Sequence, residues 1–352
     1  MYCKKFPHAA QSSGMSVRGE NMSLDFLRMN KLRFLKITLL LSILFLLTPR
    51  SVSAQDFYIT DGILMQYDGS GGSITLPSDV QKVGGSAFRD NEDVTDVTIP
   101  EGCFAIEDGA FDGCDNLRTI SLPSTLKSIG TLAFARCRSL EYVNLPPNLE
   151  VLKEGAFFDC GTIGAITIPA NVSEIGKGCF SCCKNLSIMT VDGGNKNFIA
   201  EDNVLFSSDG RTLVQYPAGR PDRSYSVPEG VETIGADSFD KAKNLREISF
   251  PHTLKKIRVQ AFSGCTGLTV IDLPESVEMV EEYAFRNCTN LCRLYVRNKD
   301  QGTKARAFES DSSLMLYVPK NSKIKEHADK YNLHYRFLDD DVYDYPDPEM
   351  KF

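Results

Sequence analysis

The chain has 352 residues, of which 42% are hydrophobic and 24% charged, and its net charge is −7 at neutral pH. This is the composition of a folded globular protein, and an acidic chain without a basic cluster excludes nucleic acid as an expected partner, because nothing neutralises the phosphates. Eight Lys/Arg and two Asp/Glu precede position 55, so residues 55–352 keep 31 basic and 44 acidic residues, a net charge of −13.

The first 54 residues differ from the rest. Basic residues lead into an apolar run of 11 residues, Ile37–Leu47, and the small residues Val52-Ser53-Ala54 follow it. Because a membrane-spanning helix needs about 20 apolar residues, the run is typical of a signal peptide, cut after Ala54. An uncleaved anchor is the alternative. We therefore expect export and no membrane span after cleavage.

Residues 1–28 match no targeting pattern, and Met29 directly precedes the basic region. We therefore assign the signal peptide to 29–54 and treat 1–28 as an upstream leader of doubtful translation. The destination of the exported chain is the cell surface or the medium, with the periplasm as a further option.

From residue 77 onward the sequence repeats every 23 residues. The repeat is marked by a phenylalanine at 88, 111, 134, 157 and 180, and again at 239, 262, 285 and 308. Prolines keep the same spacing, from Pro77 to Pro169 and from Pro228 to Pro274. A period of this length predicts a solenoid in which each copy forms one coil.

Within each unit, apolar residues recur at fixed places after the proline. The last of them form an L-x-x-I-x-L strand, as in LRTISL at 117–122 and LTVIDL at 268–273, and the proline that follows ends the strand. The Gly-Ala-Phe-x-x-Cys segment predicts a short helical turn. Stacked coils, with strands about 4.8 Å apart, would bury these residues in one continuous core.

The L-x-x-I-x-L strand, the 23-residue period and the I-G-x-x-A-F-x-x-C-x-x-L phrase resemble the BspA-type leucine-rich repeat family, over roughly Gly62 to Pro319. The resemblance implies a mostly β, right-handed solenoid with short helical turns, in secreted or surface-attached bacterial proteins. It also implies adhesion or protein binding, with host extracellular matrix among the candidate ligands.

The repeat is interrupted between Phe180 and Phe239, which are 36 residues further apart than one period. Two apolar runs flank Ser-Asp-Gly within 203–216, which predicts a β-hairpin. Asp202-Asn203-Val204-Leu205 also resembles Asp61-Gly62-Ile63-Leu64 near the start of the repeats. The hairpin either extends one coil or projects as a recognition loop.

The two ends differ from the coils between them. We expect an N-terminal cap before Pro77 and a closing helical cap over 323–337, followed by an acidic, solvated tail. The predicted organisation is: 1–28 leader; 29–54 signal peptide; 55–76 N-terminal cap; 77–183 first repeat block; 184–227 repeat strand and hairpin insert; 228–320 second repeat block; 321–352 C-terminal cap and tail.

The chain has 11 cysteines, which in an exported protein suggests disulfides. Their register instead indicates buried, unpaired thiols, because six of them share one apolar position of the repeat: Cys114, Cys137, Cys160, Cys183, Cys265 and Cys288. At such a position a thiol acts as a small hydrophobe, and Ala242 occupies it in another coil. Stacked cysteines would still lie within disulfide range, so bridges between coils stay an alternative.

No catalytic signature is present. The histidines after position 54 lack a metal-ligand partner at helical spacing, and no G-x-S-x-G, phosphate-binding loop or dinucleotide motif occurs. Cys179-x-x-Cys182 has no second pair that would complete a zinc site. We expect no enzyme, no cofactor and no metal.

A ligand would contact the outward positions of the strands, which two-residue alternation places away from the core. Most of these residues are small and polar. The larger or charged ones are the candidate ligand-binding residues: Tyr142, Asn144, Ile188, Glu247, Asp272, Arg293 and Tyr295. Aromatic residues and arginine dominate the binding energy of many interfaces.

The sequence thus predicts an exported, non-catalytic recognition or adhesion protein that binds a protein or polysaccharide through this strand face and the insert. One alternative is a structural scaffold or spacer in a surface assembly. Another is an enzyme whose site the repeat pattern hides.

Overall fold

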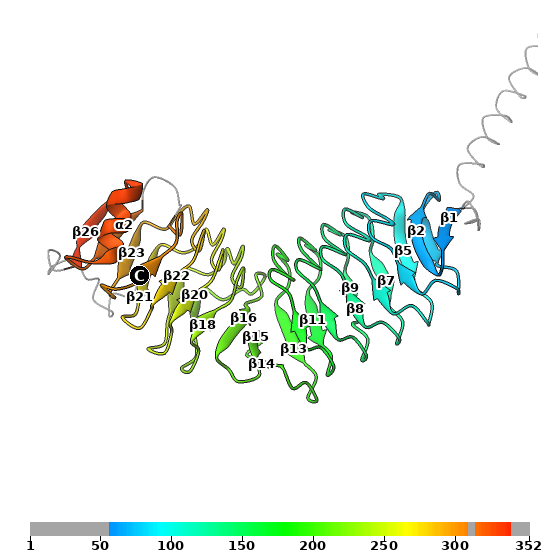
Figure 1. Ribbon diagram of the computed structural model, residues 1–352, viewed down its shortest axis with the longest axis horizontal. Helices are drawn as coiled ribbons and strands as arrows, with labels where there is room; N and C mark the ends of the chain where they lie inside the picture. Colours follow the sequence, from blue (N-terminus) through cyan, green and yellow to red (C-terminus); the bar gives the residue numbers. More distant parts are fainter. Residues whose placement is uncertain (1–55, 309–313, 339–352) are drawn as a thin grey trace, which may run out of the picture. The chain divides into compact units, whose positions relative to one another are not determined.

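The computed structural model describes residues 56–308 and 314–338, and the predicted signal peptide and acidic tail lie outside them. The described residues form a mostly β solenoid of about 12 turns with coils of about 23 residues, as predicted. Each coil contributes one short strand, a tight turn that carries the phenylalanine, and one longer strand. Figure 1 shows the strands following one another in chain order from β1 to β26.

Two series of parallel strands run along the solenoid. The long-strand face consists of β3 (Gly72–Thr75), β5 (Val94–Thr98), β7 (Thr119–Ser121), β9 (Tyr142–Val143), β11 (Ala165–Ile168), β13 (Ile188–Val191), β17 (Ser224–Ser226), β19 (Glu247–Ser249), β21 (Val270–Leu273), β23 (Arg293–Val296), β25 (Met315–Val318) and β26 (Tyr335–Phe337). The short-strand face consists of β4 (Lys82–Val83), β6 (Ala105–Ile106), β8 (Ser128–Ile129), β10 (Val151–Leu152), β12 (Glu174–Ile175), β18 (Thr233–Ile234), β20 (Lys256–Ile257), β22 (Met279–Val280) and β24 (Gly302–Thr303).

The remaining elements lie at the ends and in the middle: β1 (Phe57–Thr60), β2 (Ile63–Tyr67), β14 (Phe198–Glu201), β15 (Val204–Ser207), β16 (Thr212–Gln215) and the helix α2 (Lys323–Tyr331). Paired strands are in register by one repeat, so that Ala165 lies opposite Ile188 and Val270 opposite Arg293. The 23-residue period therefore places equivalent side chains in columns along the solenoid.

The repeated phenylalanines form two stacks in the core. Ring centroids of successive coils lie 4.7 Å apart for Phe88 and Phe111 and 5.1 Å for Phe111 and Phe134, with nearly parallel planes. The second stack runs from Phe239 to Phe308, with centroids 4.8–6.1 Å apart. These rings are fully buried, so they combine a large apolar area with stacking contacts.

The repeated cysteines also have a structural explanation. Each thiol donates to the carbonyl of the phenylalanine 26 residues earlier, as Cys137 Sγ does to Phe111 O at 3.2 Å and Cys265 Sγ to Phe239 O at 3.0 Å. The ten described cysteines are all free. Burial raises the pKa of Cys114 to about 12, so this thiol stays protonated and able to donate.

The coils form two blocks with separate cores. The first block, residues 56–192, and the second block, residues 198–338, each have their own cluster of buried apolar side chains, and Leu205 of the second block is buried in the first cluster. The short-strand series is interrupted between the blocks, since β12 does not pair with β16. The long-strand series breaks there too, between β13 and β17, and also within each block, between β9 and β11 and between β19 and β21. Figure 1 shows β14, β15 and β16 between β13 and β18.

The hairpin predicted around Ser-Asp-Gly is present, and it repeats the N-terminal cap. In the first cap, Tyr58 lies opposite Gln66 and Ile59 opposite Leu64, with a bulge between Tyr58 and Ile59. In the insert, Leu205 lies opposite Gln215 and Phe206 opposite Leu213, with a bulge at the same place. β2 then pairs with β4 as β16 pairs with β18. The second block therefore begins with a cap of its own.

This correspondence differs from the one that the sequence suggested. Asp202-Asn203 resembles Asp61-Gly62 because both pairs take left-handed backbone angles in two-residue turns. The turn at 202–203, however, joins β14 to β15, whereas β16 and not β15 takes the place of β2. The better signal is Leu64-Met65-Gln66-Tyr67, which matches Leu213-Val214-Gln215-Tyr216.

The C-terminal end is closed by α2 and β26. Ser322 caps the helix N-terminus by accepting from the N–H of Lys325, and Asn332 ends the helix in a left-handed conformation. Ile324 and Ala328 are buried, and the ring of His327 packs edge-on against Phe308 at 6.1 Å between centroids. The helix thus covers the last ring of the second stack.

Candidate ligand-binding surface

All seven candidate residues belong to the long-strand face. Tyr142, Ile188, Glu247, Asp272, Arg293 and Tyr295 lie on its strands, and Asn144 directly follows β9. The residues between them, such as Val143 and Leu294, are buried, as two-residue alternation predicts. The candidates divide between the blocks, with three in the first and four in the second.

In the first block, two large apolar side chains rise from a polar surface. Tyr142 is 66% exposed and Ile188 is 46% exposed. Ala165 occupies the coil between them in the same column and lies opposite Ile188. Adjacent strands lie about 4.8 Å apart, so the small alanine stands between the two larger exposed side chains of this column, an arrangement that we call the notch.

Hydroxyl groups surround this notch and are bonded from coil to coil. The Oγ1 atoms of Thr167 and Thr190 lie 2.9 Å apart, and the hydroxyl of Thr119 donates to a carboxylate oxygen of Asp96 at 2.5 Å. The bond from Thr119, with another from Thr95, lowers the pKa of Asp96. These pairs hold the polar side chains in place and keep Asp96 charged.

In the second block, the candidates are engaged with their neighbours. Asp272 accepts two bonds from the guanidinium of Arg297, at 2.7 and 2.6 Å. The ring of Tyr295 stacks on that of Tyr317 with centroids 4.5 Å apart. Arg293 and Tyr295 are half-buried, whereas Glu247 is exposed. Asp272 and Tyr295 are therefore held in place by neighbouring side chains.

The insert separates the two cores. Leu205 packs in the core of the first block, and its neighbours Val204 and Phe206 pack in the core of the second, because alternate residues of β15 face opposite ways. Leu205 is fully buried, while its counterpart Tyr58 in the first cap is 56% exposed. The hairpin does not project from the solenoid as a loop, because its strands are packed between the blocks.

The junction of the blocks holds buried polar groups that the sequence did not single out. The guanidinium of Arg220 is buried and pairs with Asp202 and with Asp222, each at 2.8 Å. It also lies over the rings of Tyr216 and Tyr225, at 5.4 and 6.0 Å from their centroids. This cluster fixes the segment that leads from the internal cap to β17.

Two aspartates of the second block face the last coil of the first. Asp237 lies 3.7 Å from Lys177 Nζ, and Asp240 accepts from the thiol of Cys182 at 3.1 Å. Burial raises the pKa of Asp237 to about 6, against the opposing effect of Lys177, and burial also raises the pKa of Asp240. The junction is thus sensitive to protonation.

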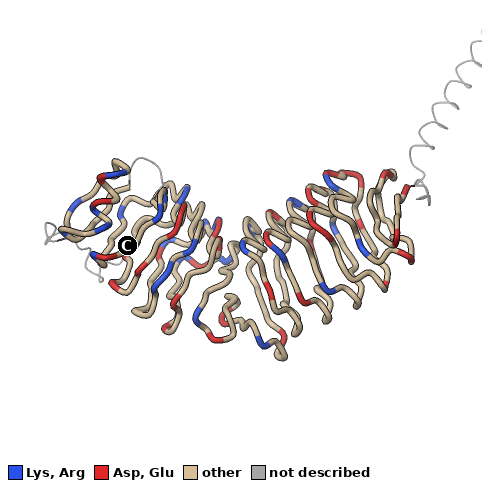
Figure 2. The backbone as a smooth tube through the Cα atoms, viewed as in Figure 1, with Lys and Arg blue, Asp and Glu red and all other residues tan. Residues whose placement is uncertain are grey.

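The short-strand face has a hollow of about 570 Å³ over β4, β6, β8 and β10. Its charged side chains are paired with each other: Lys82 with Glu107 at 3.9 Å, Lys127 with Glu150 at 3.4 Å and Lys153 with Asp108 at 3.8 Å. These are exposed pairs of low energy. Figure 2 shows basic and acidic residues interspersed along the coils.

Over residues 56–308 and 314–338, no three His, Cys, Asp or Glu side chains gather as they would around a metal ion. In the same part of the chain, no helix has the length and apolarity needed to cross a membrane. On the long-strand face, hydroxyl and amide groups can form hydrogen bonds with a ligand, and the exposed apolar side chains can pack against it.

Several solved structures resemble this chain. A pneumococcal vaccine antigen, PcpA, has a TM-score of 0.60 at 22% identity, covering 78% of this chain and 91% of that one. A leucine-rich cell surface protein of Faecalibacterium prausnitzii gives 0.48 at 23% identity, covering 80% and 97%. The leucine-rich repeat protein of T. pallidum gives 0.43 at 26% identity, covering 62% and 91%. The likeness to the pneumococcal antigen shows the fold. No curated protein matches the chain.

A family profile, the BspA type leucine rich repeat region, matches residues 65–187 and 223–333 in six copies. The gap between the matched segments coincides with the junction and the internal cap. Proteins of this family are typically secreted or surface recognition proteins without enzymatic activity. The chain belongs to the BspA-type leucine-rich repeat family.

Proposed function

We propose that the protein is an exported, non-catalytic recognition protein that binds a protein or glycan ligand through its long-strand face. The family supports this role, because its members are bacterial surface proteins with an array of stacked strands. Such an array offers a broad surface on which equivalent side chains recur in columns. The internal cap contributes by fixing the two halves of the face.

The single observation that carries the proposal is the pair of exposed apolar side chains on β9 and β13. Tyr142 and Ile188 point away from the core and are 66% and 46% exposed, so much of their apolar area stays in contact with water in the folded chain. Tyrosine is enriched at the centre of binding interfaces, where it combines a large apolar area with a hydroxyl group. The bonded hydroxyls around the notch provide a polar rim.

The test is a binding screen of the exported chain against extracellular matrix proteins and polysaccharides. The variant Tyr142→Ala/Ile188→Ser removes the notch, and Arg293→Ala changes the other end of the face. Tyr58→Ala is the matched control, because Tyr58 is an exposed tyrosine on the first cap.

We expect saturable binding that the double variant weakens at least tenfold and the control leaves unchanged, at equal melting temperature. Loss on Arg293→Ala alone would move the contact to the second block. Binding that survives both changes, or no binding to any ligand, would contradict the proposal and favour a scaffold.

A further inference from the structure

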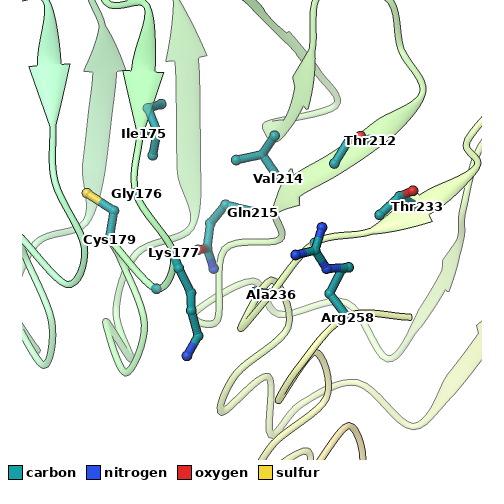
Figure 3. Close-up of a pocket in the computed structure, with 12 residues that line it drawn as sticks. Ile175, Gly176, Lys177, Cys179, Thr212, Val214, Gln215, Thr233, Ala236 and Arg258 are labelled. Carbon is teal, nitrogen blue, oxygen red and sulfur yellow. The ribbon is translucent and has the colours of Figure 1, made fainter. Parts of the chain in front are cut away.

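A second, smaller site lies at the junction of the blocks. A hollow of about 290 Å³ is lined by β12 and the turn after it on one side, and by β16, β18 and Arg258 on the other. Figure 3 shows the guanidinium of Arg258 and the amide of Gln215 turned toward the middle, with Lys177 at the rim. This volume is at the lower end of the range for ligand pockets.

Backbone groups are left open here because the coil-to-coil ladder stops. In neighbouring coils the N–H at the position of Gly178 donates to the next coil, as Gly155 does to Lys177 O and Asp237 to Val259 O, both at 3.1 Å. Among the described residues, the N–H of Gly178 and the carbonyl of Ile175 have no such partner. Both residues line the hollow.

Side chains add further unused groups. Gln215 is 4% exposed, and its Nε2 donates to Tyr216 O and Ser238 O. Within the described residues its Oε1 has no partner, although the residue lines the hollow. Arg258 uses Nε to bind Glu281 at 3.1 Å, which leaves its terminal nitrogens available. Thr212 and Thr233 also line the hollow.

These groups define the chemistry of a ligand. Gln215 Oε1 and Ile175 O require donors, while Arg258 and the Gly178 N–H require an acceptor, preferably anionic. Inorganic phosphate is a poor match because it offers few donors. A ligand with an ammonium group is a poor match, because the nearby carboxylates of Asp237 and Glu281 are already paired with Lys177 and Arg258. A molecule that carries several hydroxyls and one carboxylate satisfies both requirements.

We propose that the junction hollow binds an acidic monosaccharide unit, with its carboxylate on Arg258, its hydroxyls on Gln215 and Ile175 O, and the threonine side chains beside its ring. The site is independent of the strand-face proposal, since no candidate residue of that face lines the hollow. A free sugar acid and the end of an acidic polysaccharide share this chemistry.

The test uses the purified full chain and D-glucuronate as the probe, followed by ligand-observed NMR and calorimetry, with D-glucose as the neutral control. We expect a Kd on the order of 0.1–1 mM for glucuronate. Glucose should bind at least tenfold more weakly, because it lacks the carboxylate that would form a charge-assisted hydrogen bond with Arg258. Arg258→Gln should weaken glucuronate binding about tenfold, and Thr233→Val about threefold.

Arg211→Gln is the matched control, because Arg211 is exposed beside β16 and does not line the hollow. Equal binding of a glucuronate-terminated disaccharide would identify a glycan end as the source, and binding of the monosaccharide alone would identify a free sugar acid. No binding of either at 10 mM (about tenfold above the weakest expected Kd), or equal binding by Arg258→Gln, would overturn the proposal.

Discussion

The two caps are the same hairpin in different surroundings. Both have the L-x-Q-Y strand, the same bulge and a buried tyrosine that packs against the first phenylalanine of its block, with ring centroids 5.0 Å apart for Tyr67 and 4.8 Å apart for Tyr216. The outer side of the first cap faces solvent, whereas the outer side of the second faces another block. One hairpin can therefore close the core of one block and begin the core of the next, because alternate residues of its strands face opposite ways.

The two caps differ in the surroundings of the side chains on their outer sides. Tyr58 and Gln66 on the first cap are exposed, so water can satisfy their polar atoms. Leu205 and Gln215 occupy the same positions on the second cap and are buried. On the internal cap, Leu205 packs in the core of the first block, and Gln215 donates to a backbone carbonyl.

The largest effect is expected at Leu205. Leu205→Ala should lower the free energy of unfolding by about 2–5 kcal/mol, because it opens a cavity in the core of the first block. Tyr58→Ala, the same position on the first cap, should change it by less than about 0.5 kcal/mol. Denaturant titration of both variants measures this, and equal effects would show that the two caps are not in different surroundings.

The next effect concerns Asp237, whose pKa is about 6 when folded, above the value of about 3.9 in an unfolded chain. The folded chain therefore gains stability as the pH falls through 6 toward 4. Above pH 6, the buried charge of Asp237 lowers the stability of the folded chain. Asp237→Asn should raise stability by about 2–3 kcal/mol at pH 7.5 and leave it nearly unchanged at pH 4.

Asparagine suits the site, since residue 237 has a left-handed backbone that asparagine tolerates. Stability curves of the wild type and Asp237→Asn at several pH values provide the measurement. A variant that is less stable at pH 7.5 would show that the pair with Lys177 outweighs the burial of the charge.

A smaller effect is expected at the shared glutamine of the two caps. In most coils a cysteine thiol donates to the carbonyl of the aromatic residue 26 positions earlier. Ala242 occupies the cysteine position after Tyr216 and has no donor. Gln215 Nε2 donates to Tyr216 O instead, at 3.0 Å. Gln215→Met should cost about 1–2 kcal/mol, because it leaves a buried carbonyl unpaired. Gln66→Met, at an exposed position, should be nearly neutral, and thermal unfolding of the pair distinguishes them.

The smallest change in stability belongs to the strand face. Tyr142→Ala should alter the free energy of unfolding by less than about 0.5 kcal/mol, since the side chain is exposed. Its effect should be confined to binding. A marked loss of melting temperature would mean that Tyr142 serves packing and would remove the main support for the proposed contact.

The repeats were predictable because each coil buries the same types of residue at the same positions of the repeat. The 23-residue period fixes the phenylalanine stacks and the outward columns, so the fold and the placement of Tyr142 and Ile188 followed from spacing alone. The junction was not predictable from the repeat, since Gln215, Arg220 and Asp237 acquire their roles only where the period breaks. The Ser-Asp-Gly turn predicted the hairpin, and the L-x-Q-Y match is the local signal that this hairpin repeats the first cap.

The most direct test of the two-block account is hydrogen exchange of the wild type in low denaturant. The account predicts two cooperative openings, one for the amides of β4–β12 and one for those of β18–β24, divided between Val191 and Val204. Leu205→Ala should speed only the first opening. A single opening that includes every coil, accelerated throughout by the same variant, would contradict the account.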